Sequence, residues 1–263
     1  MKQIPQTELK TREIGKQIFY FDEIDSTNLE AKRHQEDEGG HGKVFVAEQQ
    51  NAGRGRLGRS WVSPKETGIW MSILLKPDFS PEIASQVTIL GALAAADAIR
   101  KVTKLDCQIK WPNDLVLNKK KVCGILTEMG VCDGRIQYLV LGMGINVNTE
   151  YFPDEIQDKA TSLRLEGEMV YSRESIIAEI LNSLELYYND FCENGSLKKV
   201  VNYYNSILIS KGKKVKIVEK MKTDIGVALG IDELGRLKVR TEQGEERTIV
   251  SGEVSVRGLY SYV

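Results

Sequence analysis

Hydrophobic and polar positions divide this chain into two parts with different periodicities. From residue 17 to about residue 210, short apolar runs typical of strands alternate with longer segments of helical spacing. From residue 211 onward the apolar runs are all short and β-rich, and polar turns separate them. We therefore expect a polar lead-in at 1–16, a large domain at 17–210 and a small β-barrel domain at 211–263. The strands expected in the small domain are Lys213–Glu219, Gly226–Asp232, Arg236–Arg240 and Glu246–Val250.

The large domain is predicted to be a sheet covered by helices. Apolar residues recur at helical spacing over Pro81–Val102 and Arg173–Phe191, which predicts two long helices. Shorter helices are expected at Ser26–Gln35 and Ser196–Ser206. The predicted strands are Gln17–Phe21, Lys43–Gln49, Gly68–Lys76, Cys107–Asn118, Lys121–Val131 and Arg135–Val147. A hairpin turn at Cys132-Asp133-Gly134 joins the last two, so we expect an α+β fold with a mixed sheet and helices on one side.

Composition narrows the class of protein. The chain has 263 residues and is 41% hydrophobic, which is enough for a sizeable core. Lys and Arg number 36 against 37 Asp and Glu, so the net charge of -1 argues against a general nucleic-acid binder. The four cysteines form no CxxC pair, which predicts neither a zinc site nor a disulfide framework. No signal peptide or run of 18 apolar residues is found, so a cytoplasmic protein without membrane contact is expected.

The most unusual segment is a loop rich in Gly and Arg, Gly53–Trp61, which follows a predicted strand. Its first six residues satisfy the GxGxxG pattern of dinucleotide-binding folds, which require a helix directly after the glycines. Only nine residues, including Pro64, separate Gly58 from the Gly68 that opens the next strand. A crossover helix does not fit into that length, so the sequence argues against a dinucleotide site.

Three guanidinium groups, those of Arg54, Arg56 and Arg59, alternate with glycines whose bare backbones allow a ligand to approach closely. Such a loop suits a phosphate or a carboxylate. A mobile surface loop with solvated charges is an equally simple interpretation of the composition. RNA binding through Arg-Gly sequence is a third, which the single copy and the neutral net charge weaken.

The run GRGRLGRSW resembles the signature GRGRxGRxW of biotin protein ligases. Four further motifs match that family in the same order. They are Asp25-Ser26-Thr27-Asn28, Lys110-Trp111-Pro112-Asn113-Asp114, Lys121 before Gly124-Ile125-Leu126, and Gly142-Met143-Gly144-Ile145-Asn146-Val147-Asn148. The resemblance covers nearly all of the chain from Ile18 onward and implies the class II synthetase-like biotin/lipoate ligase fold with a C-terminal SH3-like barrel. It also implies an enzyme that activates biotin with ATP to biotinyl-5'-AMP and transfers the biotin to a lysine.

The resemblance assigns roles to individual residues. Biotin must present its carboxylate to the α-phosphate of ATP, and positioned cations offset the repulsion between the two anions. Arg56 and Lys121 are the expected catalytic residues for this step. The residues expected to bind biotin are Ser26, Thr27, Asn28, Gln50, Arg54, Gly55, Arg56 and Lys121. Those expected near the nucleotide and its Mg²⁺ are Arg59, Trp61, Lys110, Asn113, Asp114 and Asn146, and no direct metal ligand is assigned.

Plainer interpretations exist for several of these residues. Ser26 to Asn28 could simply cap a helix, Trp61 could be a core residue, and the segment 111–114 could be only a turn between strands. The two histidines, His34 and His41, lie in a charged stretch, so an acyl-enzyme mechanism based on histidine has no support.

The resemblance also implies partners of the protein, and it leaves competing functions to be considered. The acceptor is expected to be a biotin carboxyl carrier protein domain of a carboxylase, and dimers form through sheet edges in this family. Many bacterial members carry an N-terminal helix-turn-helix, for which the 16 residues before the first strand leave no room. Either the natural protein is a ligase without that domain, or this sequence is the remainder of a longer protein that has it. Rival functions are a ligase for lipoate or octanoate, a sensor that binds biotinyl-adenylate without turnover, and a nucleic-acid-binding module.

Overall fold

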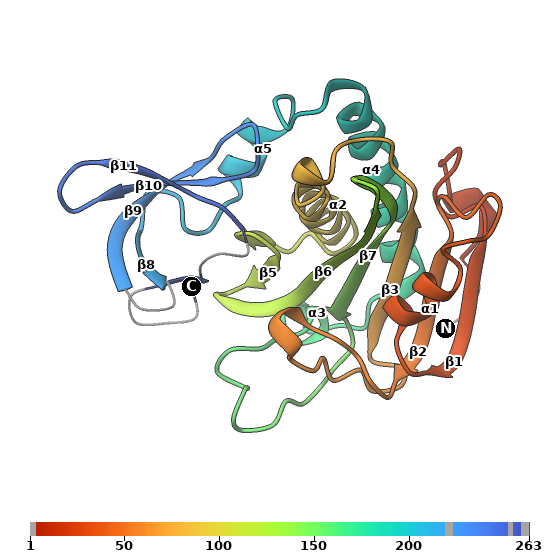
Figure 1. Cartoon of the computed structure of the whole chain (residues 1–263). Helices are drawn as coiled ribbons and strands as arrows, with labels where there is room; N and C mark the ends of the chain where they lie inside the picture. Colours follow the sequence, from red (N-terminus) through yellow and green to blue (C-terminus); the bar gives the residue numbers. More distant parts are fainter. Residues whose placement is uncertain (1–3, 219–222, 252–254, 259–262) are drawn as a thin grey trace.

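The computed structural model describes residues 4–218, 223–251, 255–258 and 263, and it contains two β-sheets (Figure 1). The strands of the larger sheet are β1 Ile18–Ile24, β2 Val44–Gln50, β3 Gly68–Leu75, β4 Gln108–Lys110, β5 Asp114–Leu117, β6 Lys120–Cys132 and β7 Arg135–Asn146. Their order across the sheet is β1-β2-β3-β7-β6-β5-β4. The pair β1 and β2 is parallel and the other neighbours are antiparallel, so the prediction of a mixed sheet is confirmed.

One predicted strand is wrong. The segment Cys107–Asn118 is two short strands, β4 and β5, which pair antiparallel with Lys110 opposite Asp114. The chain reverses between them at Trp111, Pro112 and Asn113. Proline fixes φ and donates no backbone hydrogen bond, which favours a turn there, while the apolar residues on both sides resemble a single continuous strand.

The helices are α1 Thr27–Arg33, α2 Gln86–Thr103, α3 Leu163–Gly167, α4 Arg173–Asn194 and α5 Val201–Ser206. Short 3-10 turns occur at η1 Gln6–Glu8, η2 Arg56–Gly58 and η3 Pro81–Ile83. The predicted helix starting at Pro81 is therefore divided: η3 comes first, capped by the Ser80 hydroxyl, and α2 begins five residues later. The short helix α3 was not predicted, and α5 begins later than the sequence suggested, at Val201.

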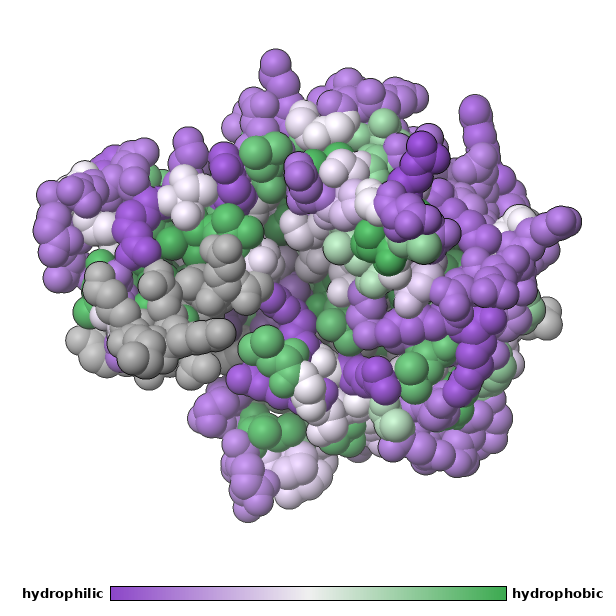
Figure 2. Space-filling model, in the orientation of Figure 1, coloured by the Kyte–Doolittle hydropathy of each residue, from purple (hydrophilic) through white to green (hydrophobic). Residues whose placement is uncertain are grey.

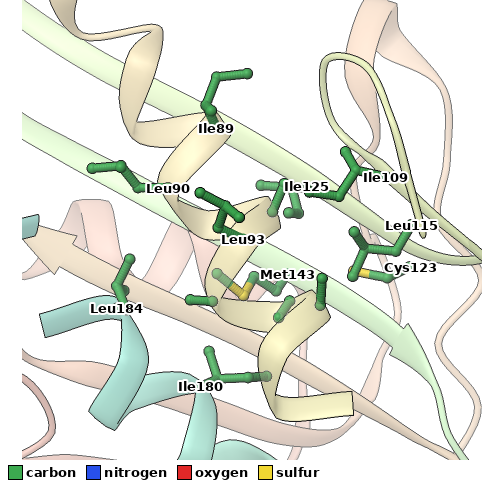
Figure 3. Packing of buried hydrophobic residues seen from close by; sticks show 14 of the residues in the cluster. Ile89, Leu90, Leu93, Ile109, Leu115, Cys123, Ile125, Met143, Ile180 and Leu184 are labelled. Carbon is green, nitrogen blue, oxygen red and sulfur yellow. The ribbon is translucent and has the colours of Figure 1, made fainter. Parts of the chain in front are cut away.

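The main core lies between one face of the larger sheet and the two long helices (Figure 3). Leu93 of α2 and Leu184 of α4 belong to the same hydrophobic cluster as Ile125 and Met143 of the sheet, and all four are buried. Among the described residues, Pro81–Thr103 is the stretch long and apolar enough to cross a membrane, and it is mostly buried inside the protein. Its hydrophobicity is thus explained by the core.

The short helix α1 lies on the opposite face of the sheet. Val44 and Val46 of β2 belong to the main core, whereas Phe45 between them packs with Ala31 of α1. Neighbouring strand residues point to opposite faces, so the two clusters are separated by the sheet itself. The expectation of helices on one side is correct for α2 and α4 but wrong for α1.

The C-terminal strands form a second, antiparallel sheet, the small SH3-like barrel. They are β8 Lys214–Val218, β9 Thr223–Ile231, β10 Leu237–Thr241, β11 Glu246–Ile249 and β12 Ser255–Gly258, in the order β11-β10-β9-β8-β12. Strand β12 was not predicted, and Glu219, at the end of a predicted strand, lies outside the described residues. The indole N–H of Trp111 donates to the Gly235 carbonyl (2.9 Å) and joins the barrel to the turn between β4 and β5.

Candidate functional site

A pocket opens where the start of α1, the loop after β2 and the middle of strands β6 and β7 meet. Its cavity has a volume of about 50 Å³, below the ~300–1,000 Å³ of typical small-molecule sites. The lining residues are Ser26, Thr27, Asn28, Gln50, Arg54, Gly55, Arg56, Trp61, Met71, Asn113, Lys121, Gly124, Ile125, Leu126, Gly142, Met143 and Gly144. Most of the residues predicted for the site are therefore gathered around one cavity.

The start of α1 supplies three buried polar side chains to this pocket. Ser26 is the N-cap residue, but its side chain makes no capping hydrogen bond. Thr27 and Asn28 turn toward the sheet, where the Ser72 hydroxyl lies 2.7 Å from Thr27 Oγ1 and donates to Asn28 Oδ1 (2.5 Å). Capping alone thus does not account for these side chains, since their polar groups face the pocket and β3.

Gln50, at the end of β2, is held in one orientation. Its Oε1 accepts from the backbone N–H of Thr27 (2.9 Å), and its Nε2 donates to the Ser63 hydroxyl (2.9 Å). Because an amide has distinct donor and acceptor ends, these two partners decide which end lies where. The wall beside α1 therefore presents fixed hydrogen-bonding groups.

The glycine-rich loop folds back on itself rather than entering a helix. Arg54 and Ser60 form an antiparallel bridge, and the backbone N–H of Trp61 donates to the Gly53 carbonyl (2.9 Å). A Cβ at Gly53 would lie 2.4 Å from the Trp61 carbonyl oxygen, so this close approach requires glycine. The three-residue turn η2 is the helical part of the segment 51–67, and a crossover helix is absent there, as the sequence argued.

Trp61 fills part of the pocket and lies over two glycines. Gly124 of β6 and Gly144 of β7 are opposite each other in the sheet. A Cβ at Gly144 would lie 2.4 Å from Trp61 Nε1, and one at Gly124 would lie 2.8 Å from Trp61 Cζ3. The indole N–H is buried and has no hydrogen-bond partner among the described residues. Trp61 is half-buried against this floor, so it is not an ordinary core residue.

The two expected catalytic cations meet at the turn that follows Pro112. Arg56 Nη1 donates to Asn113 Oδ1 (2.7 Å), and Lys121 Nζ pairs with Asp114 (2.6 Å). Lys121 Nζ also lies 5.1 Å from the centre of the Trp61 ring. Burial lowers the pKa of Arg56, and the nearby Asp114 opposes that effect. The segment 111–114 is thus a turn and also a meeting point of charges.

Four predicted residues do not line the cavity. Asp114 is linked to the cavity through its ion pair with Lys121, and Lys110 lies opposite Asp114 in the backbone register of β4 and β5. Asn146 donates to the Thr161 carbonyl (3.1 Å) from the end of β7, and Arg59 is exposed on the loop.

Gly124, Gly142 and Gly144 stand in motifs of the sequence, but the sequence interpretation gave them no role. It also did not single out Glu128 of β6, which accepts a hydrogen bond from Asn28 (2.8 Å). Glycine inside a strand is a signal of close approach by another group, and three glycines in two neighbouring strands could have been read that way. Their pairing across the sheet depends on the strand register, which the sequence alone does not show.

Magnesium fits this site with few protein ligands. No cluster of three or more metal-binding His, Cys, Asp or Glu side chains occurs in the described part of the chain. Asp114 offers a carboxylate next to the pocket, and it is already paired with Lys121. Mg²⁺ in nucleotide sites is commonly held by one or two carboxylates together with the substrate phosphates, and Asp114 suits that arrangement.

Comparison with known proteins identifies the family. A family model described as "Biotin/lipoate A/B protein ligase family" matches residues 19–146, and one described as "Biotin protein ligase C terminal domain" matches residues 212–257. The bifunctional ligase/repressor BirA of Bacillus spizizenii is 37% identical over 251 residues, which are 94% of this chain and 76% of that protein. This chain belongs to the biotin protein ligase family.

Solved structures of biotin protein ligases have the same fold. The enzyme from Aquifex aeolicus in complex with biotin and ATP is 32% identical with a TM-score of 0.80, over 92% of this chain and 99% of that one. By sequence, the biotin--[acetyl-CoA-carboxylase] ligase of Mycobacterium tuberculosis is also similar, with 29% identity over 74% of this chain and 72% of that protein. The predicted α+β fold with an SH3-like C-terminal part is confirmed.

Proposed function

We propose that this protein is a biotin protein ligase. It joins biotin to ATP as biotinyl-5'-AMP, releases pyrophosphate, and passes the biotin to a lysine of a biotin carboxyl carrier protein domain. The observation that carries the proposal is the convergence of Arg56 and Lys121 beside a pocket whose opposite wall is lined by fixed polar groups. Relatives named as biotin ligases, rather than lipoate ligases, favour biotin as the acid.

Arg56 and Lys121 are proposed to lower the barrier of the first step by electrostatics. The biotin carboxylate must approach the α-phosphate, and two unit charges about 4 Å apart repel by ~1 kcal/mol in water and several times more where water is excluded. A guanidinium and an ammonium held 2.7 Å and 2.6 Å from their partners are positioned in advance. Charges placed before the reaction cost no reorganisation during it.

The remaining lining residues are assigned by their chemistry and place. Ser26, Thr27, Asn28 and Gln50 offer hydroxyl and amide groups to the ureido ring of biotin, and Arg54 and Gly55 close over it from the loop. The proposed nucleotide-side residues are Trp61, Arg59, Lys110, Asn113, Asp114 and Asn146. Since the cavity is small, we propose that the surrounding loop residues adjust when both substrates bind.

Further parts of the proposal concern the setting of the reaction. Mg²⁺ arrives with ATP, where it neutralises phosphate charge, and Asp114 is proposed to face it. The division into a catalytic part at 17–210 and a barrel at 211–263 is proposed to serve the second step, with the carrier domain approaching between them. A cytoplasmic location is proposed, in line with the family, and dimerisation through sheet edges stays a prediction.

The first experiment is biotin-dependent exchange of labelled pyrophosphate into ATP in the presence of Mg²⁺. We expect exchange with biotin and none with lipoate. The Lys121→Ala and Arg56→Ala variants should each lose about 10²–10³-fold in kcat, the cost of removing one positioned group that stabilises developing charge. Lys120→Ala is the matched control, because its neighbouring ammonium contacts the Gln157 carbonyl on the surface and should leave exchange unchanged.

Either of two results would contradict the proposal. Exchange supported by lipoate and not by biotin would identify a ligase for another acid. Tight biotin binding without any exchange by the wild type would identify a sensor instead.

A further inference from the structure

Glu128 on β6 is a half-buried carboxylate that the proposed reaction does not use. Its side chain is 24% exposed and turns toward α1. Glu128 Oε2 accepts from Asn28 Nδ2 (2.8 Å), and Oε1 accepts from Lys32 Nζ (2.6 Å). Glu128 therefore accepts a hydrogen bond from Asn28, a residue that lines the pocket, and is not itself a lining residue.

Asn28 is fixed at both ends of its amide. A carboxylate only accepts hydrogen bonds, so Glu128 requires the amide nitrogen of Asn28 on its side. At the other end the Ser72 hydroxyl donates to Asn28 Oδ1 (2.5 Å). The Ser72 hydroxyl could donate or accept, so Glu128 decides the orientation of the amide, and a flip would create an oxygen facing an oxygen at Glu128.

Strand β7 leaves the space that the Asn28 amide needs in this orientation. A Cβ at Gly142 of β7 would lie 2.0 Å from Asn28 Oδ1, so no other residue allows Asn28 to pack there. The contacts continue to Thr27, which donates to Gln50 Oε1 (3.1 Å). The polar wall of the pocket is therefore one connected set of hydrogen bonds that begins at Glu128.

We propose that Glu128 is a positioning residue that sets the recognition of the ureido ring through Asn28. This inference rests on the proposed function. A ureido group presents one acceptor and two donors, and a wall with fixed donors and acceptors recognises it at little entropic cost. Sites built to pair such groups strongly reject acids that lack them, because their own polar groups are then left unpaired. Glu128 thus contributes to the selection of biotin without touching it.

The charge of Glu128 suits this role. Burial alone would raise the pKa of Glu128, but the hydrogen bonds from Lys32 and Asn28, together with the charges of Lys32 and Arg54, outweigh burial and lower it. The group is ionised at neutral pH and gives Asn28 a charge-assisted partner, which is stronger than a neutral one.

The decisive variant is Glu128→Gln, which keeps the size and removes the charge and the strict acceptor character. We expect the KM for biotin to rise about tenfold, the usual effect of losing one hydrogen bond to a charged group, while kcat and the KM for ATP stay unchanged in pyrophosphate exchange. Ser72→Ala should move the KM for biotin in the same direction. Glu30→Gln is the matched control on α1, since it also loses an ion pair but does not contact Asn28.

The Asn28→Ala background separates positioning from general support of the fold. If Glu128 acts through Asn28, adding Glu128→Gln to Asn28→Ala changes the KM for biotin no further. An additional loss in that background, or an unchanged KM in Glu128→Gln alone, overturns the inference and leaves the ligase activity of the wild type intact. A wild type without biotin-dependent exchange overturns the proposed function, and the inference with it.

Discussion

At the scale of single residues, the floor of the pocket depends on missing side chains. Gly124 and Gly144 lie side by side under Trp61, and a methyl group at either position would overlap the indole. The face of the molecule drawn in Figure 2 is mostly hydrophilic, with separate hydrophobic patches. The two glycines therefore leave the space in which the flat indole of Trp61 lies against the sheet.

Replacing Gly144 should impair the reaction more than it impairs the fold. Gly144→Ala pushes Trp61 from its place and raises the floor, and a misplacement of this size near reacting groups costs about 100-fold in rate. Pyrophosphate exchange measures the loss. Gly195→Ala at the exposed end of α4 is the control: its φ of 65° disfavours alanine, which lowers stability but not activity. Equal activity of Gly144→Ala and wild type would contradict the role given to the floor.

His41 should make stability depend on pH near neutrality. Its ring nitrogen Nδ1 accepts from the backbone N–H of Lys76 (3.1 Å), which requires a neutral imidazole at that atom. Burial lowers the pKa of His41 below 6.5, against the opposing charges of Glu13 and Glu185 and together with that of Lys76. The unfolded chain thus binds a proton that the folded chain resists. The free energy of unfolding is expected to fall as pH decreases from 6.5 toward the folded pKa.

Urea unfolding at several pH values between about 5 and 8 measures this slope. His41→Gln should flatten it in that range, because aspartate and glutamate groups contribute only at lower pH. The same slope in His41→Gln and in wild type would show that another group is responsible.

At the residue scale, the sequence identified side chains that carry chemistry and missed those that make space. Arg56, Lys121 and Gln50 were recognisable because they stand in or beside motifs that resemble those of biotin protein ligases. The roles of Gly144 and Glu128 were not, because they depend on which strand residues face each other and on which face of the sheet α1 lies.

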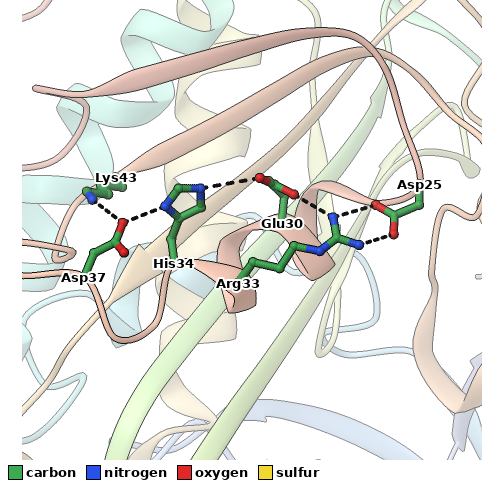
Figure 4. A network of polar contacts seen from close by, with 6 residues as sticks. All are labelled: Asp25, Glu30, Arg33, His34, Asp37 and Lys43. Carbon is green, nitrogen blue, oxygen red and sulfur yellow. Dashed lines mark hydrogen bonds and ion pairs between the residues drawn. The ribbon is translucent and has the colours of Figure 1, made fainter.

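At the scale of elements, α1 is fastened by a row of charged contacts along its outer side (Figure 4). Arg33 pairs with Asp25 (2.5 Å), whose carboxylate also accepts from Ser26 N–H (2.7 Å). The hydrogen bond from Arg33 lowers the pKa of Asp25 despite partial burial. Near the other end of the helix, His34 contacts Asp37 (2.6 Å). These contacts hold the helix start that carries the polar side chains of the pocket.

A second, better buried ion pair joins β2 to the start of α4. Arg173 Nη1 lies 2.8 Å from Glu48 Oε2, with side-chain exposures of 11% and 8%. Removing one partner of such a pair leaves an uncompensated buried charge, so Arg173→Ala should lower the free energy of unfolding by about 3–5 kcal/mol. Urea unfolding measures this loss of free energy. Arg164→Ala is the control, because the exposed ion pair of Arg164 with Glu150 should contribute only ~0–1 kcal/mol. Similar losses of unfolding free energy in Arg173→Ala and Arg164→Ala would contradict the importance given to the buried pair.

Elements with a long periodic pattern were predicted well, and short or interrupted ones were not. Helices α2 and α4 keep their apolar spacing over many turns, and their positions follow from it. Helix α1 has seven residues, too few for the pattern to show which face of the sheet it covers. A turn at 111–114 was open as an alternative, but the strands on either side of it have only three and four residues, too few for a pattern to separate them.

At the scale of the whole molecule, the barrel is attached to the catalytic sheet at the turn that carries Asn113 and Asp114. Trp111 of that turn is 3% exposed, and its indole N–H reaches the Gly235 carbonyl, 124 residues further along the chain. A contact across so many residues has no local signal in the sequence. The sequence could therefore predict two parts but not how they meet.

Loss of that hydrogen bond should loosen the barrel selectively. Trp111→Phe preserves most of the packing but leaves the buried Gly235 carbonyl without its donor, which costs about 1–3 kcal/mol. Hydrogen exchange should become faster in β9 and β10 while β3 keeps its protection, since contacts are lost on one side of the boundary only. Uniformly faster exchange in both sheets would show that they unfold as one unit.

The positions of the three tryptophans have a practical consequence. Trp61 lies in the pocket, Trp111 at the boundary with the barrel, and Trp70 is buried in the larger sheet, where its indole N–H donates to the Glu48 carbonyl (3.2 Å). Indole emission depends on polarity and on nearby quenching groups, so the three rings report on three different environments. With Trp70 replaced by phenylalanine, variants that keep one of the other two would show by fluorescence when the pocket fills and when the barrel moves.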